Sequence, residues 1–177
     1  VETTMATRAL KGRVPKTDAL LLSRATHAGT VFLGKTNMTE FAFSGLGINT
    51  THETPANACD TEVERIPGGS SSGAGVAVAR GLGPIAMGSD TGGSVRIPAS
   101  LNGITGLKTT IGALPLDGVL PLSPLLDTIG PLTADVGDAA AMWSVLAGRP
   151  MADLSGVDLK GRLFVAVADS LWSDVDP

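Results

Sequence analysis

Residues 68–98 read GGSSSGAGVAVARGLGPIAMGSDTGGSVRIP and contain two loops rich in glycine and serine. The apolar segments VAVA and PIAM lie between these loops, and a disordered linker would lack such segments because it buries no core. Fixing many glycines in one conformation costs chain entropy. We therefore expect two tight, functional turns, each held by elements of the core.

The first loop, residues 68–73, leads into a small and apolar segment at 74–81 that predicts a helix. Serine is a favoured N-cap residue, so we expect Ser71 or Ser72 to begin this helix. Ser70 would then lie just ahead of the positive end of the helix dipole.

The second loop, residues 90–94, follows a strand-like segment at 84–88 and precedes another short helix. Consecutive glycines allow main-chain N–H groups to converge on one point, which suits a negatively charged oxygen. Ser94 stands at the end of this loop, where its hydroxyl would face such a site.

Three interpretations fit a glycine- and serine-rich turn between a strand and a helix: a packing turn, a phosphate-binding loop, and a nucleophile beside its own oxyanion hole. A phosphate-binding loop is disfavoured because the pattern G-x-x-x-x-G-K-[ST] is absent, and a dinucleotide site is disfavoured because its acidic residue is missing. A packing turn and a nucleophile beside an oxyanion hole both remain. The nucleophile needs a base, and neither loop contains a histidine.

Taken together, the two loops resemble the signature sequence of the amidase signature hydrolases. The resemblance is carried by residues 68–73 and 88–98, with Ser94 lying 24 residues after Ser70, and extends more loosely to 34–41 and 126–133. It implies an α/β fold in which helices flank a mixed central sheet. Residues 1–177 would form a partial amidase signature domain, incomplete in this chain.

The resemblance also implies a Ser–Ser–Lys triad. Ser94 matches the nucleophile that becomes acylated, and Ser70 matches the bridging serine, usually held by a cis peptide bond, that relays a proton to the lysine. The matching oxyanion hole consists of the main-chain amides of Thr91, Gly92, Gly93 and Ser94. The substrate channel of the family would begin at Ala42, Phe43 and Ser44. We expect three residues to support the site without acting chemically: Asp90 and Arg96 as an ion pair, and Ser71.

The lysine of the triad would fall a few residues before Val1, ahead of the segment at 2–5. Lys35 is the alternative base within the chain, because a lysine buried near a serine can lose its proton. Residues 34–37, however, resemble a family segment that does not supply the base. The chain is therefore expected to be a fragment that is inactive alone.

The resemblance implies the hydrolysis of a carboxylic amide. A glutaminase subunit that passes ammonia to a tRNA-dependent amidotransferase reaction is the alternative within the same class. A noncatalytic scaffold derived from the fold is the alternative from a different class. The sequence does not decide between substrates, because specificity depends on loops that it cannot place.

The composition of the chain limits the classes of partner that we expect it to bind. The net charge is −4, only 3% of residues are aromatic and no basic stripe is present, so direct binding of nucleic acid is not expected. Two histidines, one cysteine and no clustered carboxylates predict neither a metal nor another cofactor. The single cysteine, Cys59, and the lack of a spanning segment or signal favour a cytoplasmic protein. The family resemblance implies a small amide as the substrate. A homodimer is left open.

Outside the two loops, the sequence predicts helices that alternate with strands, as in an α/β fold. We expect a helix at 17–28, a loop-rich stretch at 41–60 and a covering loop with an apolar underside at 109–125. A helix at 136–146 would begin near Asp135 or Asp138 and end at Gly148. A buried strand is predicted at 30–34 and a core strand at 103–107. Residues 129–133 predict a further strand, and residues 163–167 are strand-like.

Overall fold

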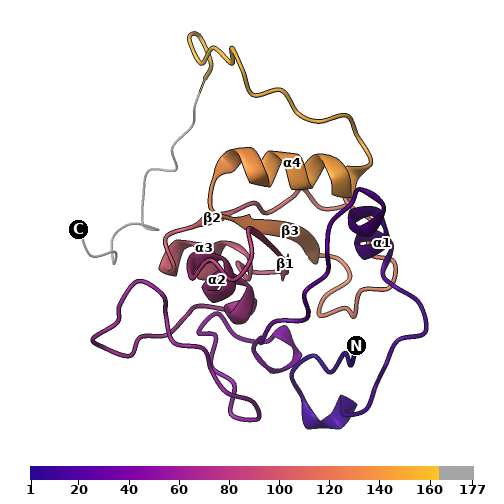
Figure 1. The fold of residues 1–177 in the computed structure, drawn as a ribbon, viewed down its shortest axis with the longest axis vertical. Helices are drawn as coiled ribbons and strands as arrows, with labels where there is room; N and C mark the ends of the chain where they lie inside the picture. The colour runs from indigo at the N-terminus through magenta and orange to yellow at the C-terminus, as the bar shows by residue number, and fades with distance from the viewer. Residues whose placement is uncertain (164–177) are drawn as a thin grey trace.

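The structure is a computed structural model that describes residues 1–163, and in it a three-stranded sheet lies between two layers of helices (Figure 1). Helices α1 and α4 cover one face of the sheet, whereas α2 and α3 cover the other. The main elements are α1 (Leu20–His27), α2 (Ser72–Ala79), β1 (Ile85–Asp90), α3 (Arg96–Leu101), β2 (Thr105–Gly106), β3 (Thr128–Thr133) and α4 (Val136–Ala147). Two short 3-10 turns, η1 (Arg8–Leu10) and η2 (Glu40–Ala42), lie in the N-terminal part.

Strand β3 is the centre of the sheet and is buried along its whole length. It pairs with β1 on one side, where Ile85 lies opposite Thr133 and Asp90 lies opposite Thr128, and with β2 on the other. The predicted α/β class is confirmed. Both pairings among residues 1–163 are antiparallel, so the part of the sheet described here contains none of the parallel pairs that a mixed sheet would add.

Side chains from the two faces of β3 pack into two separate apolar clusters, because successive residues of a strand point to opposite faces. Ile129 packs into the cluster under α1 and α4, and Leu132 packs into the cluster under α2 and α3. Leu114, from the loop at 109–125, is buried in the first cluster, which confirms that this loop has an apolar underside. The cluster around Leu132 places α2 and α3, which flank the candidate site.

Helix α4 begins and ends where its sequence predicts. Asp135 is the N-cap, and its side chain accepts a hydrogen bond from the Asp138 N–H at 2.9 Å. Gly148 ends the helix in the left-handed conformation that glycine adopts without steric cost. No helix of residues 1–163 combines the length and the apolar character needed to cross a bilayer.

The strand predicted at 30–34 is wrong. No strand is assigned there, and the Val31 and Leu33 side chains are 81% and 76% exposed. A β-strand needs a neighbour for its main-chain groups, and within residues 1–163 no other strand pairs with this segment. Helix α1 also begins later than predicted, at Leu20. The strand predicted at 163–167 lies almost wholly outside the described residues.

Candidate active site

The first loop buries the Ser70 side chain completely. Within residues 1–163, its hydroxyl has no hydrogen-bond partner. The main chain around it is firmly held, since the Thr39 N–H donates to the Ser70 carbonyl at 3.0 Å and the Gly69 N–H donates to the Gly45 carbonyl at 2.8 Å. The peptide bond between Gly69 and Ser70 is cis. A buried hydroxyl without a partner is uncommon, and the Ser72 hydroxyl two residues further on is a second one. Ser70 differs from Ser72 in its position in the loop that meets the loop of Ser94.

Gly69 allows the loop at 39–47 to lie directly against Ser70. A Cβ atom at position 69 would approach Thr39 Oγ1, the Ser44 carbonyl oxygen and the Gly47 nitrogen to 2.7 Å each, which is closer than real Cβ contacts. Glycine is therefore required by packing here.

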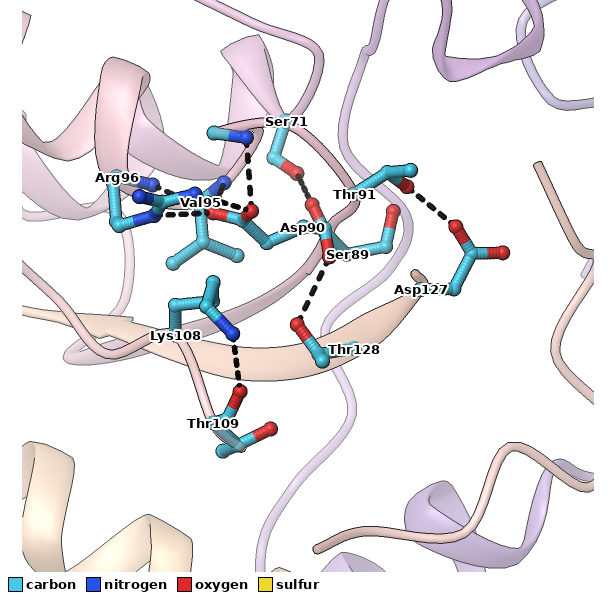
Figure 2. A network of polar contacts seen from close by, with 11 residues as sticks. Ser71, Ser89, Asp90, Thr91, Val95, Arg96, Lys108, Thr109, Asp127 and Thr128 are labelled. Carbon is cyan, nitrogen blue, oxygen red and sulfur yellow. Dashed lines mark hydrogen bonds and ion pairs between the residues drawn. The ribbon is translucent and has the colours of Figure 1, made fainter. Parts of the chain in front are cut away.

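Asp90 organises the second loop from inside (Figure 2). Its carboxylate is fully buried at the end of β1 and accepts hydrogen bonds from the N–H groups of Gly93, Val95 and Arg96. The Arg96 guanidinium also donates to both carboxylate oxygens, with one nitrogen 3.0 Å from Oδ1 and Nε 3.1 Å from Oδ2. The expected ion pair is thus present, and it is joined by three main-chain donors that the sequence did not reveal.

These contacts set the pKa of Asp90. Burial raises it, but the hydrogen bonds from Arg96 and Val95 and the charge of Arg96 outweigh burial and hold the pKa below its ordinary value. The folded pKa therefore lies below that of the unfolded chain, which is about 3.9. The carboxylate contributes stability above that pH, and the contribution disappears as the pH falls through the folded pKa.

Replacing Asp90 with alanine is expected to lower the free energy of unfolding by about 3 kcal/mol, because three main-chain donors and Arg96 lose their acceptor. Urea unfolding at neutral pH measures this loss. Asp90→Asn should also flatten the fall in stability below pH 4. If its pH dependence matched that of the wild type, the inferred direction of the Asp90 pKa shift would be contradicted.

One of the four amides expected in the oxyanion hole already has an acceptor in this structure. The Gly93 N–H donates to Asp90 Oδ1 at 2.9 Å, so this amide supports the loop and is not free to bind a substrate oxygen. Within the described chain, the main-chain N–H groups of Thr91, Gly92 and Ser94 donate no hydrogen bond to a carboxylate or to a loop carbonyl. Gly92 is exposed with open space beside its Cα, and Ser94 is half-buried.

The two loops meet at the start of α2. The Ser71 N–H donates to the Ser94 carbonyl at 3.3 Å, which brings the residue after Ser70 against the candidate nucleophile. Ser71 occupies the N-cap position of α2, but its hydroxyl donates to the Ser89 carbonyl at 3.4 Å and does not cap the helix. Gly88 permits this approach, since a Cβ atom there would lie 2.9 Å from the Ser71 Cβ.

A groove of about 540 Å³ lies beside the first loop. Phe43 and Ser44, which were expected in the substrate channel, line it, whereas Ala42 is buried and does not. The groove is lined by Thr39, Glu40, Phe41, Phe43, Ser44, Ile48 and Leu122. Thr39 and Ser44 also contact the turn at Gly69, so the groove adjoins Ser70.

The main chain is strained at Phe41, which lines the groove, and at its neighbour Ala42. Phe41 and Ala42 have φ values of +53° and +60°, in the left-handed region that non-glycine residues seldom adopt. Met5 and Ala6 are also left-handed, and the Phe41 N–H donates to the Met5 carbonyl at 3.0 Å. Such conformations concentrate at binding and catalytic sites.

Lys35, the alternative base, does not join this arrangement. It is exposed, and its ammonium donates to the Thr3 hydroxyl rather than to a serine of the two loops. Partial burial and the positive charge of Arg13 lower the pKa of Lys35, while Asp18 opposes this shift. Within residues 1–163, no group of three or more His, Cys, Asp or Glu side chains is placed to bind a metal ion.

Asp127 is a member of the site to which the sequence alone assigns no role. It is 6% exposed and accepts a 2.5 Å hydrogen bond from the Thr91 hydroxyl (Figure 2). The signal that could have revealed it is an aspartate placed directly before a buried strand.

Comparison with known proteins identifies the family. A family model for amidases matches residues 1–169. The chain is 45% identical over 153 residues to a glutamyl-tRNA(Gln) amidotransferase subunit of Symbiobacterium thermophilum, covering 86% of this chain and 31% of that protein. It is 40% identical over 177 residues to mandelamide hydrolase of Pseudomonas putida, covering 97% and 34%.

A solved amidase structure has the same fold as this chain, in agreement with the sequence relatives. The peptide amidase of Stenotrophomonas maltophilia superimposes with a TM-score of 0.76 at 41% identity, covering 83% of this chain and 31% of that one. The chain thus spans about a third of the length of the proteins that it matches. The sequence, the fold and the match over residues 1–169 together show that this chain belongs to the amidase signature family.

Proposed function

We propose that the protein hydrolyses carboxylic amides, with Ser94 as the nucleophile and Ser70 as its proton relay. The observation that carries the proposal is the Ser70 hydroxyl, which is fully buried and unpaired within the described chain beside the loop of Ser94. A relay hydroxyl must hydrogen-bond to the nucleophile and to the base during the reaction. Within the described chain the Ser70 hydroxyl bonds neither to Ser94 nor to a structural acceptor, so the proposal requires that the two hydroxyls meet when the substrate and the lysine are in place. Membership of the amidase family supports the same reaction class.

In the proposed reaction, Ser94 Oγ attacks the amide carbonyl carbon while its proton passes to Ser70 and the Ser70 proton passes to a lysine. The amides of Thr91, Gly92 and Ser94 bind the oxyanion that forms. The C–N bond then breaks and the amine leaves with a proton. Water hydrolyses the resulting ester on Ser94 and releases the carboxylic acid.

The lysine in this proposal is the one that the resemblance places ahead of Val1. We accordingly propose that residues 1–177 alone are inactive, and the tests below use the full-length protein. A reducing, cytoplasmic location is part of the proposal, because Cys59 is the only cysteine among residues 1–177 and these residues cannot form a disulfide among themselves.

A glutaminase that serves an amidotransferase is the second candidate function. It is favoured by the 45% identity to an amidotransferase component. The two candidates share their chemistry and differ in the amide that they accept.

The test is ammonia release by the full-length protein from L-glutamine, mandelamide and a peptide with a C-terminal amide. Turnover of mandelamide or the peptide amide supports an amidase, and turnover of glutamine alone supports the glutaminase. A folded protein that releases no ammonia from any of these amides and forms no covalent serine adduct would instead be the noncatalytic scaffold.

A further inference from the structure

Asp127 links two parts of the candidate site through one buried carboxylate. Its Oδ1 accepts the 2.5 Å hydrogen bond from the Thr91 hydroxyl (Figure 2). Its Oδ2 accepts from the main-chain N–H groups of Leu122, at 2.8 Å, and Ser123, at 3.0 Å. Thr91 and Asp127 directly extend the antiparallel pair of β1 and β3, in which Asp90 lies opposite Thr128. Leu122 and Ser123 belong to the loop that precedes Asp127, so the carboxylate ties this loop to the turn that follows β1.

Of the two segments that Asp127 links, one carries the proposed oxyanion amides and the other lines the groove. Thr91 is the first residue after β1 and begins the turn that ends at Ser94. Leu122 lines the groove together with Phe43 and Ser44, but it comes from a separate loop. One side chain thus holds both the turn that carries the proposed oxyanion amides and a wall of the groove.

The turn after β1 needs such a restraint. Pairing between β1 and β3 ends at Asp90 and Thr128, where the Thr128 hydroxyl donates to the Asp90 carbonyl at 2.9 Å. Beyond that point Gly92 is exposed with open space around it, and glycine restricts the main chain less than any other residue. On the Ser94 side the turn is fixed by the Asp90 carboxylate. On the Thr91 side the side-chain restraint is the bond to Asp127.

We infer that Asp127 is a positioning residue, which acts through Thr91 on the oxyanion amides and through Leu122 on the groove wall. The inference rests on the proposed function. An oxyanion hole works when its donors lie about 2.7–3.1 Å from the developing charge, and a displacement of about 1 Å can lower a rate about 10²-fold. The Thr91 bond should therefore affect the chemical step, whereas the Leu122 bond should affect binding.

The experiment measures the reaction of the full-length protein with an alkyl fluorophosphonate, in which the Ser94 Oγ–P bond forms, the P–F bond breaks and the serine proton passes to the base. Two constants are measured: kinact, the rate constant for covalent modification at saturating fluorophosphonate, and KI, the fluorophosphonate concentration that gives half of that rate. Thr91→Val removes only the hydroxyl donor and should lower kinact about 10- to 10²-fold with KI unchanged. Thr91→Ser keeps the donor and should restore kinact. Asp127→Asn should lower kinact and also raise KI.

Thr133→Val is the matched control, because Thr133 is a fully buried threonine at the other end of β3 whose hydroxyl donates to the Asp135 carbonyl at 2.7 Å. It loses a comparable hydrogen bond and should keep wild-type kinact. Equal loss in Thr133→Val and Thr91→Val, or failure of Thr91→Ser to restore the rate, would overturn the inference. If Asp127→Asn does not fold, the two Thr91 variants decide the outcome.

A different result would reject the proposed function itself. Undiminished amide turnover by Ser94→Ala would reject the hydrolase mechanism, whatever the Thr91 variants do. Loss of turnover in Ser94→Ala, combined with wild-type kinact in both Thr91→Val and Asp127→Asn, would leave the hydrolase standing and reject the role of Asp127.

Discussion

Replacing Ser94 with alanine is expected to lower kcat for amide hydrolysis on the order of 10⁶-fold, the size of the effect that nucleophile removal has in serine hydrolases. The reason is chemical, since alanine leaves no oxygen to attack the carbonyl carbon. The fold should persist, because Asp90 accepts its hydrogen bonds from Gly93, Val95 and Arg96, and none of these involves the Ser94 side chain. Steady-state ammonia release and circular dichroism measure the two outcomes.

Ser100→Ala is the control for this variant. Ser100 is an exposed serine of α3, six residues after the candidate nucleophile, and its loss should leave kcat unchanged. A Ser94→Ala protein that retains more than about a tenth of wild-type turnover would mean that another group forms the acyl intermediate.

Replacing Ser70 with alanine should lower kcat about 10²- to 10⁴-fold, the range typical of a group that transfers protons in the rate-determining step. The free energy of unfolding should change by less than about 1.5 kcal/mol, because alanine breaks no hydrogen bond to any residue of 1–163. A large loss of activity with little loss of stability separates a chemical role from a structural one. Parallel kinetics and urea unfolding provide the comparison.

The chain offers a close control in Ser72. Its hydroxyl is also fully buried without a partner inside residues 1–163, and it lies two residues from Ser70, at the first position of α2. Ser72→Ala should resemble Ser70→Ala in stability and keep kcat within a few fold of the wild type. Equal losses of activity in both variants would show that any change at this helix end impairs the site, and would contradict a specific relay through Ser70.

Local signals in the sequence predicted much of the fold. Helix α4 carries its own cap and stop in Asp135 and Gly148, and its observed bounds lie within one residue of those predicted. The strand predicted at 129–133 likewise agrees with β3 to within one residue. The apolar segment at 30–34 gave the same kind of signal but has no strand beside it within residues 1–163, and a strand depends on a neighbour that its own residues cannot specify.

The candidate site was predictable where the residues themselves carry the signal. The ion pair of Asp90 and Arg96 was expected from opposite charges across a turn, and it is present. The contribution of the Gly93 amide was not predictable, because the Asp90 carboxylate takes that donor only once the turn has closed. The role of Asp127 was hidden for a related reason, since its hydrogen bond to Thr91 joins residues 36 positions apart.

The most direct test of the central claim is to treat the full-length protein with a fluorophosphonate and map the modified peptide by mass spectrometry. We predict a single adduct on Ser94, formed much more slowly in Ser70→Ala. An adduct on a different serine, or rapid labelling of Ser94 that Ser70→Ala leaves unchanged, would contradict the assignment of these two hydroxyls.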